Sequence, residues 1–299
     1  MTTVTEPSRT DLARQTAIRT AAGTSQLPSR LVEPPEALRP WITDIGVIAH
    51  APDGPRSVTH VPDAAVRLVV RTLPEGGSDV LAVGPRTRAS YNTGKRLPLC
   101  LDLRIRPGAA RPLLGAPAGD LVGRVVPLKE LPGRSTARID RALREWGHDA
   151  PVDVALAELA ELLPPAFEQG AAADRDREAL VRSAVSALST RPGRPRPAPV
   201  PEVAHALAVS ERQLRKLFTD GVGVSPKHFA RIDRARQLLA GARDGAGAPV
   251  PWAGLAQATG YYDQSHMAAE FRALFGVAPS AFFSGRLPAG TPCPSRAGR

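Results

Sequence analysis

Three cations and one amide lie close together in the last third of the 299-residue chain: Arg212, Gln213, Arg215 and Lys216. Arginine and lysine donate hydrogen bonds to the O6 and N7 atoms of guanine, glutamine pairs with adenine, and all of them hold phosphates. These side chains therefore offer the chemistry of DNA recognition. The plain alternative is a solvated, charged helix face.

The element that must position these side chains is a short helix. Ser210 precedes it and is a good N-cap, because its hydroxyl accepts an orphan backbone N–H. The apolar residues of the segment share one face of a helix: Leu214, Leu217 and Phe218. Arg212 and Lys216 lie nearly opposite this face, so the spacing predicts a buried apolar face and an exposed cationic one.

A second helix–turn–helix pattern occupies residues 251–276. Gly260 marks its turn, where glycine tolerates positive φ, and Asp263 is the expected N-cap. The predicted buried stripe consists of Met267, Phe271 and Leu274. The outward candidates are Gln264, Ser265, His266, Ala269 and Arg272. This face has one cation, whereas the face of the first helix has three, so we expect it to bind DNA more weakly.

A long helix is predicted between the two patterns, over residues 225–243. Ser225 caps it, and Pro226 takes the first helical position, where its missing N–H costs nothing. Some eighteen residues span roughly 27 Å. Successive major-groove segments on one face of B-DNA lie ~34 Å apart. A rod of this length is suited to holding two recognition helices about one turn of DNA apart.

The composition favours a polyanionic partner. The formal net charge is +10, and residues 178–299 hold 16 Lys and Arg against 8 Asp and Glu. The only two cysteines, Cys100 and Cys293, exclude a disulfide framework and a multi-cysteine zinc site. His50 and His60 have no carboxylate pattern around them. We therefore expect no metal and no cofactor.

Several classes of protein are disfavoured by missing patterns. The chain has neither a signal-peptide core nor a run of 18 apolar residues, so we expect a cytoplasmic protein without a membrane span. It has no Gly-rich phosphate loop, Ser/His/Asp elbow or HExxH motif. A DNA-repair enzyme fused to a DNA-binding module would need a metal-held nucleophilic cysteine cluster. We therefore expect no enzyme.

Short strand-like segments separated by Pro and Gly precede the helical region. In LCLDLRIR (99–106), Leu and Ile alternate with Cys100 and polar residues, and Pro107-Gly108 follows. This period of two predicts a strand with one buried face. Similar segments occupy residues 41–50, 66–72 and 79–83. Together they favour a small sandwich or barrel.

The helical patterns resemble the AraC/XylS family of transcription regulators between Pro201 and Arg286. The motifs that carry this resemblance are SERQLRKLF, GVSPKHF and GYYDQSHMAAEFRALFGVAPSAF. The resemblance implies two helix–turn–helix units, joined by a long helix, that enter successive major grooves. Its base-contacting positions fall on Arg212, Arg215 and Lys216 in the first unit and on Ser265, His266 and Ala269 in the second.

The chain departs from the family pattern at three positions. Ala269 replaces a polar or basic residue and cannot donate a hydrogen bond to a base. Met267 stands where Phe or Leu is common, and Ala208 occupies a turn position that is often Gly. Segments within 60–131 resemble the small β-rich, sensor-like domain that precedes this module in some family members, a likeness that specifies no ligand.

These observations predict an α+β multidomain chain. The expected parts are a disordered arm (1–30), a β-rich sensor-like domain (31–134), a helical connector (135–190), a Pro-rich spacer (191–200), an AraC-type DNA-binding domain (201–286) and a disordered tail (287–299). We expect a DNA-binding regulator, modulated by a small-molecule effector of unknown site or by dimerisation, which meets RNA polymerase if it activates. A nonspecific architectural DNA-binding protein, or a regulator controlled by a protein partner, is the alternative.

Overall fold

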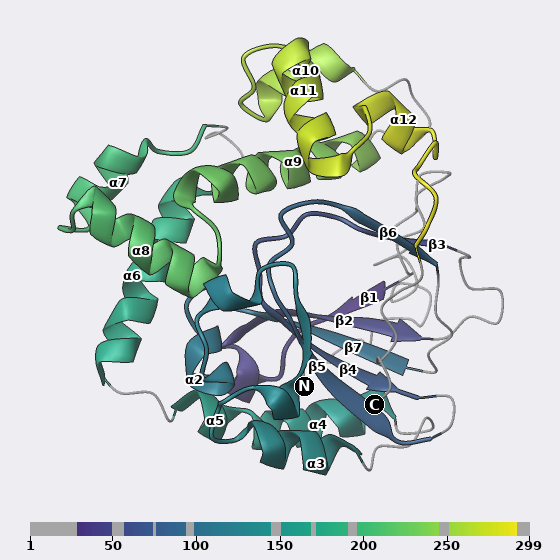
Figure 1. The fold of residues 1–299 in the computed structure, drawn as a ribbon, viewed down its shortest axis with the longest axis vertical. Coiled ribbons are helices and arrows are strands. Elements are labelled where there is room, and N and C mark those ends of the chain that lie inside the picture. Colours follow the sequence, from purple (N-terminus) through teal and green to yellow (C-terminus); the bar gives the residue numbers. More distant parts are fainter. Residues whose placement is uncertain are drawn as a thin grey trace, which may run out of the picture.

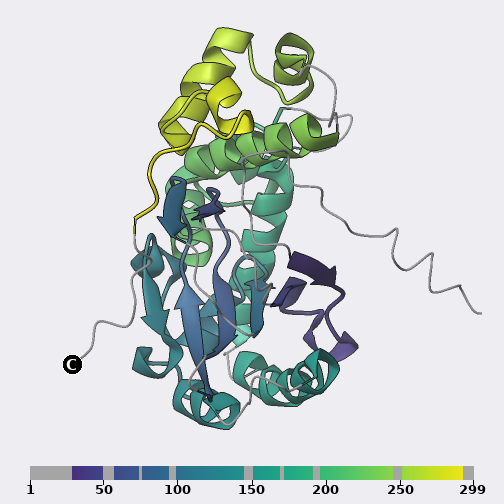
Figure 2. The same ribbon diagram turned by 90° about the vertical axis from the view of Figure 1, so that its right-hand side faces the viewer.

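The computed structural model describes residues 29–49, 57–73, 76–93, 99–144, 151–168, 172–190, 196–244 and 251–291. Figures 1 and 2 show a β-sheet with one group of helices beneath it, and a second helical layer that lies across its other end. The predicted arm lies almost entirely outside the described residues. Its last two positions, Ser29 and Arg30, already belong to the first strand.

Within the described residues, one antiparallel sheet contains six strands, in the order β1 (Ser29–Val32), β2 (Ile42–Ala49), β7 (Leu99–Ile105), β4 (Arg67–Thr72), β5 (Ser78–Val83) and β8 (Val125–Pro127). A separate antiparallel ribbon pairs β3 (Ser57–His60) with β6 (Ser90–Thr93). The predicted β-rich fold class is thus confirmed. The sheet is open, with β1 and β8 at its edges.

The alternation in β7 is confirmed by the structure. Leu99, Leu101, Leu103 and Ile105 are all buried, whereas Asp102 and Arg104 are partly exposed. Cys100 is buried as well, although the pattern placed it on the polar face. Burial raises the pKa of its thiol to about 12, which leaves the group protonated and unreactive at neutral pH.

The helices divide between two hydrophobic cores. Those beside the sheet are η1 (Glu36–Leu38), α2 (Ala110–Leu114), η2 (Ala118–Leu121), η3 (Leu128–Glu130), α3 (Thr136–Arg144), α4 (Val152–Leu162) and α5 (Pro164–Glu168). Those of the second layer are α6 (Ala172–Leu188), α7 (Val200–Ala206), α8 (Glu211–Val222), α9 (Pro226–Asp244), α10 (Trp252–Ala258), α11 (Gln264–Phe275) and α12 (Pro279–Phe283).

The predicted helical connector, residues 135–190, is not one unit. Ile139, Leu159 and Phe167 of α3 to α5 are buried in the core of the sheet. Val181 and Leu188 of α6 are buried in the other core, with α7 and α8. Helical periodicity identifies a buried face but not its partner, and the connector therefore splits between the two cores.

The predicted Pro-rich spacer ends within one residue of its expected bound. Helix α7 begins at Val200, and the Ala198 N–H donates to the Ala187 carbonyl of α6 over 3.3 Å. Residues 191–195 lie outside the described part. The described end of the spacer therefore runs along α6 and does not hold the DNA-reading unit away from it.

The predicted disordered tail is partly ordered. Thr291 forms a parallel bridge with Asn92 of β6, and its N–H donates to the Tyr91 carbonyl over 2.9 Å. The Thr93 N–H in turn donates to the Thr291 carbonyl. Residues 287–291 thus return to the ribbon, because β6 offers them backbone partners that composition does not reveal. No helix in the described part is long and apolar enough to cross a membrane.

His60 gives the fold a pH dependence that can be measured. Burial, followed by Arg86 and Arg67, lowers the pKa of His60 from 6.5 to about 4. Between pH 6.5 and 4, His60 therefore binds a proton in the unfolded chain but stays neutral in the folded chain. The free energy of unfolding should fall by about 3 kcal/mol across this window and remain unaffected above it.

Urea unfolding at several pH values checks this expectation. The variant His60→Gln should lose much of the slope between pH 6.5 and 4. The variant His205→Gln, which alters an exposed histidine in α7, should retain it. Equal slopes for wild type and His60→Gln would show that His60 does not titrate in this way.

Candidate nucleic-acid interface

The described residues contain two helix–turn–helix units, formed by α7 with α8 and by α10 with α11. Their turns share one backbone geometry. Ala208 has φ of 51° and Gly260 has φ of 79°. Each donates its N–H to the carbonyl three residues earlier, over 3.0 and 3.1 Å. The positive φ expected at Gly260 is confirmed, and the first turn repeats it with alanine.

Ala208 should therefore be strained. A side chain in the left-handed region crowds the backbone, whereas glycine adopts it freely. We expect Ala208→Gly to raise the free energy of unfolding by about 1 kcal/mol. The control is Ala273→Gly, at an exposed position within α11, which should lower it by about 1 kcal/mol. Thermal and urea unfolding measure both; a loss of stability in Ala208→Gly would argue against strain.

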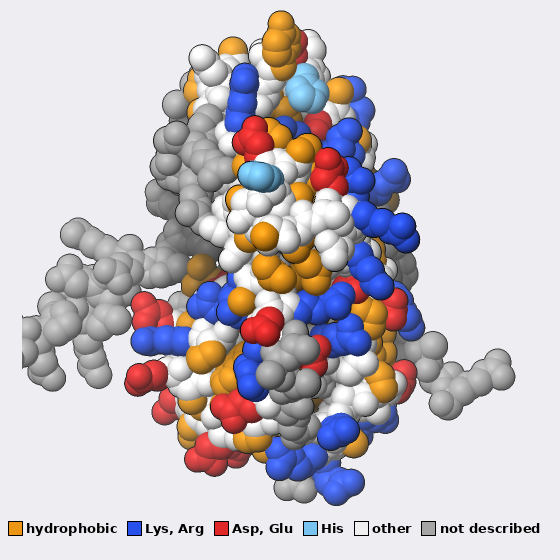
Figure 3. Space-filling model, turned by 90° about the vertical axis from the view of Figure 1, so that its left-hand side faces the viewer, with side chains coloured by type: hydrophobic (Ala, Val, Ile, Leu, Met, Phe, Trp, Pro, Cys, Tyr) orange, Lys and Arg blue, Asp and Glu red, His pale blue; other side chains and the backbone are white. Residues whose placement is uncertain are grey.

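Helix α8 is the recognition helix of the first unit, and its sequence features are confirmed. Ser210 caps it in a full capping box with Gln213. Leu214 and Phe218 are buried, while Leu217 is only partly buried. The four candidate DNA contacts are all exposed: Arg212, Gln213, Arg215 and Lys216. Figure 3 views the face of the molecule on which α6, α7 and α8 lie, and it shows Lys and Arg side chains along one edge of this face.

Two of these side chains have partners within the helix. The Gln213 Oε1 atom accepts the Ser210 N–H over 2.9 Å, so a bidentate contact to adenine would require opening the capping box. Arg215 forms an ion pair with Glu211, in which both side chains are exposed, by 61% and 42%. Such an exposed pair contributes little stability. Arg215 can therefore exchange Glu211 for a base or phosphate at small cost.

Helix α11 is the recognition helix of the second unit. Asp263 caps it by accepting the His266 N–H over 2.7 Å, and Met267, Phe271 and Leu274 are buried as predicted. The candidate residues on its outer side are all exposed: Gln264, Ser265, His266, Ala269 and Arg272. The His266 ring meets the buried Tyr261 edge-on at 5.6 Å, which restrains its orientation.

A buried acid attaches α11 to α9, and sequence reasoning missed it. Glu270 is 8% exposed and accepts hydrogen bonds from Arg231 over 3.2 Å and from Arg234 over 2.9 Å. The Arg234 guanidinium also lies over the Tyr261 ring, 5.1 Å from its centre. A signal was present, because Glu270 follows Met267 by three residues and thus lies on the apolar stripe. A charge at such a position requires a partner.

Helix α9 joins the two units, but its length does not by itself set their separation. Its nineteen residues extend about 28 Å. Phe218 of α8 meets Phe229 edge-on, while Glu270 of α11 binds Arg231 and Arg234. These contacts of both recognition helices lie within the first half of α9. The one-turn separation along DNA stays a prediction.

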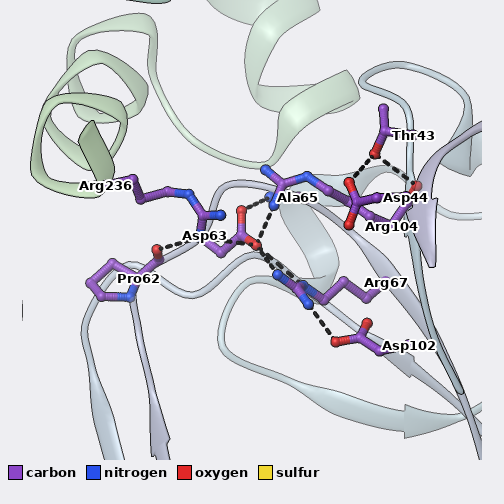
Figure 4. Close-up of polar contacts among 9 residues, drawn as sticks. All are labelled: Thr43, Asp44, Pro62, Asp63, Ala65, Arg67, Asp102, Arg104 and Arg236. Carbon is purple, nitrogen blue, oxygen red and sulfur yellow. Dashed lines mark hydrogen bonds and ion pairs between the residues drawn. The ribbon is translucent and has the colours of Figure 1, made fainter. Parts of the chain in front are cut away.

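A second buried acid connects α9 to the sheet. Asp63, which follows β3, is 2% exposed and pairs with Arg67 of β4, with Arg104 of β7 at 2.8 Å and with Arg236 of α9 at 3.5 Å. Figure 4 shows these guanidinium groups converging on the carboxylate. Burial alone would raise the pKa of Asp63, but Arg104, Arg236 and Arg67 outweigh it and hold the pKa well below its usual range.

A cavity of about 510 Å³ lies between the sheet side of the molecule and α6. Trp41 and Phe167, whose rings stack at 5.2 Å, form an apolar wall beside Arg106, and Glu178 and Arg182 of α6 face them. Burial raises the pKa of Glu178, which Arg182 partly offsets. Across the residues that the structure describes, no three metal-ligating side chains form a cluster.

A family model described as a helix-turn-helix domain matches residues 203–285. This span contains both turns, both recognition helices and α9. Residues 203–285 are an AraC-type helix–turn–helix domain. A helix–turn–helix domain is a DNA-binding unit, so the match supports DNA-binding transcription regulation at the level of class.

Solved structures similar to the chain include a probable AraC family transcriptional regulator from Rhodopseudomonas palustris CGA009, with 24% identity over 37% of this chain and 99% of that one, at a TM-score of 0.31. ToxT from Vibrio cholerae O395 is 11% identical over 87% of this chain and 94% of its own, at 0.39. The C-terminal domain of AraT from Geobacillus stearothermophilus is 20% identical over 41% and 92%, at 0.26. No curated protein sequence matches the chain.

Proposed function

We propose that the chain is a sequence-specific transcription regulator that reads two adjacent major-groove segments with α8 and α11. One observation carries the proposal: each recognition helix follows the same kind of turn, buries its apolar stripe and exposes its polar face. The proposed DNA contacts are Arg212, Gln213, Arg215 and Lys216 in α8, and Gln264, Ser265, His266, Ala269 and Arg272 in α11.

In this proposal α8 and α11 contribute unequally to DNA recognition. Three exposed cations of α8 can contact guanines and phosphates, whereas α11 offers Arg272 and a methyl group at Ala269. A methyl group contacts thymine but cannot donate to a base. We therefore assign most base discrimination to α8 and a more tolerant contact to α11.

The N-terminal unit, residues 29–168, supplies the regulation in this proposal and extends the sensor-like domain expected at 31–134 by α3 to α5. The DNA-binding domain expected at 201–286 shares its core with α6.

A small molecule in the cavity beside α6 would touch Trp41 and Phe167 of the sheet side and Glu178 and Arg182 of α6. Because α6 packs against α8, its binding could reach a DNA-reading helix. A homodimer, and contact with RNA polymerase if the protein activates, belong to the same proposal.

Selection from a random DNA library with the purified full chain, at physiological salt and with competitor DNA, tests the proposal. Two short enriched blocks about one helical turn apart are the expected result. Binding without any enriched block would reject it and favour a nonspecific architectural protein. Enrichment only after a protein partner is added would favour regulation by that partner.

The variant Arg215→Ala tests the role of α8 directly. We expect it to cost about 1–3 kcal/mol on the selected site and to relax preference at one base position, because a donor pair to a base edge is lost. The control, Arg138→Ala, removes an exposed arginine of α3 and should leave affinity unchanged. Titrations on selected and random DNA measure both. Equal weakening of Arg215→Ala on the two DNAs would make Arg215 a phosphate contact only.

A further inference from the structure

The C-terminal end of α11 is held by the ribbon of the N-terminal unit. The Ala89 N–H donates to the Leu274 carbonyl over 2.8 Å, and the Tyr91 hydroxyl donates to the Phe275 carbonyl over 2.7 Å. The last four carbonyls of a helix have no partner within it. Two of those of α11 thus find donors some 184 residues away in the chain.

The C-terminal end of α8 is held in the same way by the sheet. The Gly108 N–H, just beyond β7, donates to the Gly221 carbonyl over 3.1 Å. Gly223, with φ of 92°, ends the helix so close to the N-terminal unit that a Cβ there would lie 2.6 Å from Pro85 and 2.9 Å from the Ala118 carbonyl oxygen. The contact is therefore close as well as polar.

Helix α9, which carries both units, is fixed to the same body. Arg236 pairs with Asp63 and also donates to the Pro62 carbonyl over 3.4 Å (Figure 4). Asp63 is already bound by Arg67 and Arg104 of the sheet, so its position is not free to vary. The N-terminal unit thus contacts α8, α9 and α11 at three separate places.

We propose that the N-terminal unit is a template that fixes the distance and angle between α8 and α11, with Tyr91, Gly108 and Asp63 as positioning residues. The separation between the two DNA segments that the protein accepts would then be set by the sheet and ribbon as well as by α9. The inference rests on the proposed function, because it concerns how two DNA segments are read together.

The double variant Tyr91→Phe, Arg236→Met removes the hydroxyl that donates to the Phe275 carbonyl of α11 and the ion pair between Arg236 of α9 and Asp63. Phenylalanine and methionine keep the apolar part of each side chain. Its binding is measured on DNAs in which the two selected blocks are moved apart or together by one to three base pairs. We expect wild type to prefer one spacing by at least tenfold, and the double variant to lose most of that preference. The single variant Tyr91→Phe should lose part of it.

The control Arg138→Met removes an exposed arginine of α3 and should keep the wild-type spacing preference. A folded double variant with the wild-type preference would overturn the inference. If wild type selects no two-block site, the proposed function has failed instead, and a measurement without DNA then decides the inference.

That measurement is the distance between spin labels at Ala206 and Ala273, exposed positions in the two units, in a chain with Cys100 and Cys293 replaced by alanine. We expect one narrow distance distribution in the otherwise unaltered protein and a broader one in the double variant. Equally narrow distributions would overturn the template inference whatever the DNA result.

Discussion

Asp63→Asn is expected to lower the free energy of unfolding by about 3–5 kcal/mol at pH 7, the range for removing one member of a buried ion pair. Asparagine keeps the shape and can still accept the Ala65 N–H that Asp63 accepts over 3.1 Å. It removes the charge that balances Arg67, Arg104 and Arg236. Among the described residues, Arg67 alone of these three keeps a second ion pair, with Asp102. The loss would therefore come from uncompensated guanidinium groups.

The same carboxylate predicts a pH dependence. Since the folded chain holds the pKa of Asp63 below its ordinary 3.8, its contribution is complete above pH 3.8 and is lost as the pH falls below it. Urea unfolding at pH 7 and pH 3 should thus show a smaller difference between wild type and Asp63→Asn at pH 3.

Asp79→Asn is the matched control for Asp63→Asn, because within the described residues Asp79 forms an ion pair with one arginine, Arg71, and its side chain is 19% exposed. We expect a loss of about 1 kcal/mol for this control, as for a partly exposed pair. Equal losses for Asp63→Asn and Asp79→Asn would contradict the view that three arginines depend on Asp63.

Glu270→Gln is expected to cost about 3 kcal/mol, near the lower limit for a buried pair because Arg231 is still 31% exposed. Arg231 and Arg234 would lose the carboxylate that they share, while the amide keeps the volume. Since the carboxylate joins α11 to α9, we also expect Glu270→Gln to lose more affinity for the second DNA segment than for the first. Chemical unfolding and titrations on DNAs with either block altered measure the two effects.

Glu202→Gln, which changes an exposed acid of α7, is the control for Glu270→Gln and should leave stability unchanged. A Glu270→Gln protein as stable as wild type would mean that the two arginines are adequately solvated without the acid. A uniform loss of affinity for both DNA blocks would mean that Glu270 supports the whole domain and not α11 alone.

Much of the local structure could be predicted because its causes are local. The alternation of Leu99 to Ile105 predicts the buried face of β7, and Ser210 and Asp263 predict the starts of α8 and α11. The positive φ at Gly260 follows from the same kind of reasoning. Each of these features depends on residues within a few positions of one another.

The long-range contacts could not be predicted in this way. Asp63 meets Arg236, far along a chain that holds 39 Lys and Arg, and nothing local selects one cation among so many. The return of Thr291 to β6 depends on where α12 ends in space. Glu270 is an intermediate case, because its place on an apolar stripe signals a partner without identifying Arg231 and Arg234.

The membership of α6 in the second core changes what can be transplanted from this protein to another. Val181, Ala184 and Leu188 pack with Leu214 and Phe218, and Arg177 of α6 forms an ion pair with Asp220 of α8. A DNA-reading segment that began at residue 201 would lack α6 and would expose this apolar surface to solvent, which favours aggregation. The portable DNA-reading module therefore starts with α6, near Ala172, and a host protein would need an acid placed to meet Arg236.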